Sequence, residues 1–186
     1  ESVYETDVFK PVMDMLSEKY SLGESKNRVL ADHLRAASFI LSEGVIPSNE
    51  GQGYIPRRLI RKCVAVINSA GVEKIDFTTE LNSLIDAQGD FYPMLKRNKE
   101  LVIHNINEEI SDFLPIIQTG REKIESILKN IKKGPFPGKE AFELVTTHGL
   151  PLDVLIHELS EKKIELNTEE YEECFQTHRN ISRVVK

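Results

Sequence analysis

The chain has 186 residues, of which 40% are hydrophobic and 29% are charged. A disordered chain is poorer in apolar residues, and this length suits one domain or two small helical ones. No apolar run approaches the length of a membrane-spanning helix, and no signal segment opens the chain. We therefore expect a soluble globular protein that does not enter a membrane. The first residue is Glu1 rather than Met, which leads us to expect a piece of a longer gene product.

The net charge of −6 at pH 7 at first sight excludes a nucleic-acid partner. The charge is unevenly distributed, however. Arg57, Arg58, Arg61 and Lys62 fall within six residues that contain no acid, whereas the last fifty residues are rich in Glu. A basic patch on an acidic body can still bind a phosphate backbone locally.

The two cysteines, Cys63 and Cys174, lie far apart and have no metal-site or redox-motif spacing. Both fall on apolar helical faces, where a free cysteine behaves as a small hydrophobic residue. We expect buried, reduced thiols in a reducing compartment. The predicted location of the protein is the cytoplasm, with an organelle as the alternative.

Apolar residues recur at helical spacing nearly everywhere, and glycines or prolines end most of these runs. The run from 44 to 53 is instead rich in Gly, Pro, Ser and Asn, which is typical of a loop. No alternating strand of useful length occurs, so the predicted fold class is all-α. The expected helices lie between Asp7 and Gly23, between Ser25 and Gly44, and at about 56–70, 79–87, 92–132, 139–147, 152–162 and 168–185.

The longest of these helices contains Pro115, which should kink or divide it. Soon after its predicted end comes the clearest linker, Gly-Pro-Phe-Pro-Gly at 134–138. We therefore predict two packed helical subdomains, 1–133 and 134–186, with one long kinked helix in the first.

Residues for catalysis or metal binding do not form a recognisable pattern. The five histidines lack metal-ligand spacing with suitable partners, and the sequence contains no phosphate-binding glycine loop and no nucleophile elbow. The adjacent pairs Glu108–Glu109 and Glu169–Glu170 are interpreted as solvated helix surface rather than acid–base pairs. We expect no catalytic residue, metal or cofactor in this chain.

One segment, from 44 to 62, has a different character, because a polar, glycine-rich loop leads directly into a helix with three early arginines. The amide of Asn49 can both donate and accept hydrogen bonds, and Arg57, Arg58 and Arg61 can bind phosphates. Alternatively, the arginines pair with acids of the same protein. The residues alone do not separate these two interpretations.

This segment, GVIPSNEGQGYIPRRLIRK, resembles the alanyl-tRNA synthetase signature G-V-x-P-S-N-E-x-x-G-Y followed by R-R-x-I-R-R. Further similarities run in family order along the chain: SVYETDVF at 2–9 resembles S-N-Y-D-T-D-L-F, RVLADHLRA at 28–36 resembles R-V-I-A-D-H-I-R-A, and 138–142 with 149–153 resemble G-x-x-A-F and G-F-P-x-D.

The resemblance implies the helical middle region of an alanine–tRNA ligase, which holds the tRNA(Ala) acceptor stem. Family members recognise a G·U wobble pair in that stem, which an Asn of the P-S-N-E loop and an Asp of a later L-Y-D-T-Y-G segment approach from opposite grooves. The Asn corresponds to Asn49 here, and it would read the exocyclic amine of the guanine in the minor groove. Arg57, Arg58 and Arg61 would then bind the backbone and set the register.

The second family position is different in this chain. LVTTHG at 144–149 aligns with L-Y-D-T-Y-G, which places Thr146 where the family has Asp. Threonine can still form a hydrogen bond, but it carries no charge and reaches less far. The resemblance therefore implies weaker dependence on the wobble pair, and restoring Asp at this position should sharpen it.

The resemblance also implies what lies outside this chain. The parent enzyme would use ATP and Mg²⁺ in an upstream class II catalytic domain, with Zn²⁺ in a downstream editing domain. The chain itself would position tRNA without catalysing aminoacylation. The alternative is a standalone helical protein-interaction module derived from a synthetase, for which the acidic C-terminal half and Thr146 would be suited.

Overall fold

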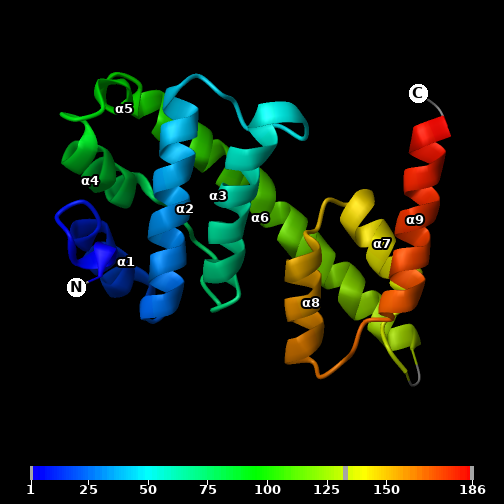
Figure 1. Ribbon diagram of the computed structural model, residues 1–186. Helices are drawn as coiled ribbons and strands as arrows, with labels where there is room; N and C mark the ends of the chain where they lie inside the picture. Colours follow the sequence, from blue (N-terminus) through cyan, green and yellow to red (C-terminus); the bar gives the residue numbers. More distant parts are fainter. Residues whose placement is uncertain (1, 132–133, 185–186) are drawn as a thin grey trace. The chain divides into compact units, whose positions relative to one another are not determined.

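The computed structural model describes residues 2–131 and 134–184, and over these residues the fold is all-α (Figure 1). The predicted fold class is therefore confirmed. The described residues contain no strand, apart from an isolated bridge between Phe136 and Leu166. The helices are α1 (Lys10–Tyr20), α2 (Glu24–Ser42), α3 (Tyr54–Asn68), α4 (Thr78–Gln88), α5 (Pro93–Arg97), α6 (Lys99–Asn130), α7 (Gly138–Thr146), α8 (Leu152–Glu161) and α9 (Thr168–Val184), with short 3₁₀ turns at Val3–Glu5 and Gly51–Gly53.

Contacts divide the chain into two compact units, residues 1–113 and 114–186. This contact boundary falls inside α6, and the Pro/Gly linker at 134–138 lies within the second unit. The second half of α6 has its own apolar side, with Ile117 and Ile124 buried. That half of α6 is therefore part of the same compact unit as the helices that follow it. The functional subdomains 1–133 and 134–186 stay a prediction.

The first unit is built around α2, which packs against α1, α3, α4 and α5. Leu30, Leu34 and Leu41 recur along its inner side and are fully buried. On α3, Ile60 and Ile67 are fully buried as well. Each such side chain stabilises the fold by roughly 1.5–3 kcal/mol through burial, so the inner side of α3 is firmly held and its orientation is fixed.

The long helix differs from the prediction at its start. The chain forms a short helix, α5, and then α6, with Asn98 between them. The side-chain amide of Asn98 donates to the backbone oxygen of Ser42 at 2.7 Å, which ties this break to the end of α2. The helix continues through Pro115, so the proline does not divide it. The kink expected there stays a prediction.

In the second unit, α7 and α9 approach closely at their N-terminal ends. A Cβ atom on Gly138 would lie 2.2 Å from the backbone nitrogen of Tyr171, so only glycine fits there. The backbone N–H of Gly138 donates to Oε2 of Glu170 at 2.6 Å, and the ring of Phe142 packs edge-on against Tyr171. These contacts fix where α7 begins and therefore where its last residue, Thr146, lies within the unit.

Candidate nucleic-acid interface

The loop before α3 is a closed turn with a defined backbone. The N–H of Ser48 donates to the oxygen of Gly53 at 3.1 Å, and the hydroxyl of Ser48 donates to the oxygen of Glu50 at 2.7 Å. A Cβ atom on Gly53 would lie 2.2 Å from the backbone oxygen of Ile46, so the two ends of the loop touch. Gly51, at φ +61°, has the left-handed backbone that the turn requires. These contacts close the base of the loop below its tip.

Asn49 lies at the tip of this turn and is exposed. Within the described ranges, its side-chain amide makes no hydrogen bond to the protein. An amide that is held on an ordered turn and is free to donate and accept can read a polar edge of another molecule. The position matches the role that the sequence predicts for Asn49, and the role itself stays a prediction.

The three predicted arginines do not form one surface. Arg57 and Arg61 are one helical turn apart and both bind Glu109 of α6, with their Nε atoms 3.1 and 2.6 Å from the same oxygen, Oε1. Arg58 is exposed instead, and it has no acidic partner among the described residues. Two of the arginines are therefore paired with an acid of the same protein, as the alternative interpretation expected. The third, Arg58, is available to bind a phosphate.

The Arg57–Arg61–Glu109 cluster is largely buried. The side chains of Arg57 and Arg61 are 20% and 12% exposed, and that of Glu109 is 9% exposed. The guanidinium of Arg61 also lies over the ring of Phe113, 4.6 Å from its centroid. Burying a carboxylate is unfavourable unless it is paired, so this cluster holds α3 against α6 and fixes the direction in which Arg58 points.

The interpretation of Glu109 as solvated surface was wrong, while Glu108 beside it is exposed. The sequence carried a signal that could have found it. Glu109 lies three residues after Ile106 and four before Phe113, so helical spacing places it on the buried stripe. A charged residue on such a stripe needs a buried partner, and two arginines supply it.

Thr146 is the last residue of α7 and is exposed. Its hydroxyl donates to the backbone oxygen of Phe142, one turn earlier, at 2.7 Å. This internal bond leaves the oxygen of Thr146 able to accept a hydrogen bond from another molecule. Thr146 belongs to the second contact unit and Asn49 to the first.

Among the residues that the structure describes, other reactive side chains do not converge on a second site. In the described part of the chain, no three His, Cys, Asp or Glu side chains are placed to hold a metal ion. Cys63 is fully buried, and burial raises the pKa of its thiol far above the ordinary value. Cys174 is only partly buried and is also a free thiol. None of the helices described has the length and apolar character needed to span a bilayer.

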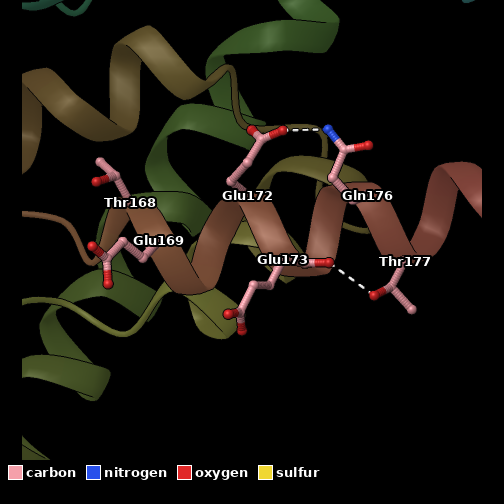
Figure 2. A pocket seen from close by; sticks show the side chains of 6 residues that line it. All are labelled: Thr168, Glu169, Glu172, Glu173, Gln176 and Thr177. Carbon is pink, nitrogen blue, oxygen red and sulfur yellow. Dashed lines mark hydrogen bonds between the residues drawn. The ribbon is translucent and has the colours of Figure 1, made fainter.

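A shallow hollow lies along one side of α9, and Figure 2 shows acidic side chains around it. The hydroxyl of Thr177 donates to the backbone oxygen of Glu173 at 2.8 Å, and the amide of Gln176 donates to Glu172 (Figure 2). Carboxylates repel phosphates, so this side of α9 is unsuited to contact RNA. The residues lining it are Thr168, Glu169, Glu172, Glu173, Gln176 and Thr177.

Comparison with known proteins gives consistent matches over the whole chain. The family model for tRNA synthetases class II (A) matches residues 1–186. Alanine–tRNA ligases are similar to the chain: 33% identical over 98% of the chain in Thermotoga petrophila, 36% over 97% in Petrotoga mobilis and 34% over 97% in Buchnera aphidicola. The chain spans only 22%, 22% and 21% of these relatives, respectively.

Proposed function

The chain belongs to the family of tRNA synthetases class II (A), and we propose that it binds and positions the acceptor stem of tRNA(Ala) within an alanine–tRNA ligase. The observation that carries this proposal is the ordered turn with the exposed, unpartnered amide of Asn49 at its tip. This is the residue that the family motif assigns to the wobble pair. Asn49 reads the minor groove of the stem, where the guanine amine of a G·U pair is available as a donor.

Arg58 supplies the principal electrostatic contact. It is exposed on the same helix that the turn leads into, and no acid among the described residues neutralises it. Arg57 and Arg61 act mainly through Glu109, by fixing α3 so that Asn49 and Arg58 keep one spacing. Arg57, which is the more exposed of the two, can add a weaker phosphate contact. Thr146 contributes a neutral hydrogen-bonding group from the second unit.

The parent enzyme supplies the chemistry. We assign ATP and Mg²⁺ to its catalytic domain and Zn²⁺ to its editing domain, both outside this chain, and place the enzyme in the cytoplasm. The contribution of the present chain is to hold the stem so that the tRNA terminus meets the activated alanine. Positioning of this kind lowers the entropic part of a reaction barrier.

The experiment is a titration of the purified chain with an RNA hairpin that copies the tRNA(Ala) acceptor stem, at several salt concentrations. We expect binding that weakens steeply with salt, because phosphate contacts release counterions. An Arg58→Glu variant should bind many times more weakly, while Lys96→Glu, on the exposed surface of α5, serves as a matched charge reversal. Absence of salt-sensitive binding in the wild-type chain would reject the proposal.

A second candidate is a helical protein-interaction module, which the acidic side of α9 favours (Figure 2). The same titration separates the two functions. If the hairpin does not bind while a basic partner protein binds to this side of α9, the interaction module gains support. Glu169→Lys and Glu173→Lys should then abolish binding of that partner.

A further inference from the structure

Large apolar and aromatic side chains are exposed around the Asn49 turn. Ile46, just before it, is 68% exposed, and Tyr54 and Ile55, which begin α3, are 49% and 55% exposed. Exposed apolar surface that is contiguous with polar recognition groups marks an interaction site more often than bare solvent surface. These side chains flank the two groups that the proposed function places on RNA.

Tyr54 has a specific relationship to Arg58. The two residues are four apart on α3, so their side chains lie on the same side of the helix, with Cβ atoms roughly 5–6 Å apart. Both are exposed, and neither the phenol hydroxyl nor the guanidinium bonds to another described residue. The tyrosines at positions 4 and 20 are different, because their hydroxyls donate to Asp32 and to the backbone oxygen of Asp76.

We propose that Tyr54 contacts the ribose of the RNA strand whose phosphate binds Arg58, with its hydroxyl hydrogen-bonded to a 2′-OH. Ribose and phosphate are covalent neighbours along a strand, so a strand crossing this side of α3 meets both residues. The minor groove of an A-form stem displays its 2′-hydroxyls, and this is the groove that Asn49 would enter. The ring covers the apolar edge of the sugar, and the hydroxyl distinguishes RNA from DNA.

This inference rests on the proposed function and deepens it, because it makes the surface selective for ribose as well as for the base pair. The contributions of Arg58 and Tyr54 can then be distinguished by the salt dependence of RNA binding. Loss of a phosphate contact lowers the slope of log affinity against log salt, whereas loss of a neutral hydrogen bond lowers affinity at every salt concentration.

The test uses the acceptor-stem hairpin and a panel of hairpins that each carry one 2′-deoxy sugar. We expect Tyr54→Phe to bind the all-ribose hairpin about threefold to tenfold more weakly, the range of one hydrogen bond, with an unchanged salt slope. When the 2′-deoxy sugar is at one or two particular positions, the wild type should bind the hairpin more weakly than it binds the all-ribose hairpin. Tyr54→Phe should bind these two hairpins with equal affinity. That non-additivity identifies the bonded hydroxyl.

The matched control is Tyr92→Phe, since Tyr92 is 48% exposed in the same unit and lies before α5. It should bind every hairpin as the wild type does. Equal affinity of Tyr54→Phe and wild type for the all-ribose hairpin overturns the inference, and so does an additive loss at every sugar. Either result leaves the proposed function standing if the wild type binds; if the wild type does not bind, both fall.

Discussion

The Nε atom of Arg61 lies 2.6 Å from Oε1 of Glu109, and this contact joins the start of the candidate interface to the long helix α6. Glu109 serves Arg57 in the same way, so one carboxylate holds two guanidiniums. Arg58, on the same helix, is exposed and has no acidic partner among the described residues. The effect of the Glu109 cluster on stability can be measured separately from the effect of Arg58 on RNA binding.

Replacing Glu109 with Gln should destabilise the chain by about 3 kcal/mol, because two largely buried guanidiniums lose their counter-charge. Urea unfolding followed by far-UV circular dichroism measures this change. Glu108→Gln removes the same charge one residue earlier, where the side chain is 62% exposed, and should change stability by less than about 0.5 kcal/mol. Equal effects of the two variants would show that the cluster contributes little to the fold.

Arg58→Ala should affect RNA binding, whereas Arg61→Ala should affect mainly the stability of the fold. Arg58→Ala removes an exposed phosphate contact, so the salt slope of hairpin binding should fall by about 0.7–0.9 with stability unchanged. Arg61→Ala breaks a buried pair and should lower stability first. Salt-dependent binding and urea unfolding, measured on both variants, separate these outcomes. If Arg61→Ala kept wild-type stability but lowered the salt slope of hairpin binding as far as Arg58→Ala does, the structural role of Arg61 would be contradicted.

Gly53→Ala should disturb the Asn49 turn without unfolding the chain. The added methyl would lie 2.2 Å from the backbone oxygen of Ile46, so the two ends of the loop must move apart. We expect hairpin affinity to fall at least as far as in Asn49→Ala. Gly71→Ala, in a different loop with open space around the site, is the control, with a cost confined to its positive φ. Wild-type affinity in Gly53→Ala would show that the turn need not be preorganised.

Thr146→Asp should increase the preference for a G·U over a G·C hairpin, because it restores the residue that the family motif has at this position. A negative charge at the end of α7 is expected to cost about 0.3–1 kcal/mol of stability. Thr147→Asp places the same charge on the next exposed residue and should leave the preference unchanged. The ratio of the two dissociation constants is the measurement, and identical ratios in wild type and Thr146→Asp would reject the role.

Stability should fall as the pH drops below about 6.5, in part through His33. Burial holds the pKa of His33 below its ordinary value of 6.5, although Asp32 opposes this effect. The unfolded chain therefore takes up the proton first as the pH falls, which favours unfolding. The loss of unfolding free energy between pH 7.5 and pH 5.5 should be smaller in His33→Gln than in wild type. His104→Gln, whose side chain is 71% exposed, is the control; equal pH dependence in wild type and His33→Gln would contradict the assignment.

The sequence predicted most of the helices because the apolar stripes are long and regular. Leu30, Leu34 and Leu41 mark the buried side of α2, and glycines 23 and 44 lie at its ends. The stripes do not show the break at Asn98, where the side-chain amide donates to the backbone oxygen of Ser42, 56 residues earlier. The contact boundary inside α6 is likewise a property of the folded chain. A single apolar stripe does not tell which helices cover each half.

The candidate interface was predicted in part. The sequence placed Asn49 in a glycine-rich loop, and the exposed turn is consistent with that. It could not separate Arg58 from Arg57 and Arg61, because their environments depend on a carboxylate about fifty residues later. Tyr54 was not singled out, because the sequence alone does not show whether its ring is buried or exposed. Its exposure is a property of the folded chain.

A paired titration tests most directly whether Asn49 reads the wobble pair. Wild type and Asn49→Ala are each titrated with the G·U hairpin and with the G·C hairpin at one low salt concentration. Asn130→Ala, an exposed amide at the end of α6, is the control. We predict that the wild type prefers G·U and that Asn49→Ala binds both hairpins alike, with Asn130→Ala unchanged. A preference for G·U that survives in Asn49→Ala would contradict the account.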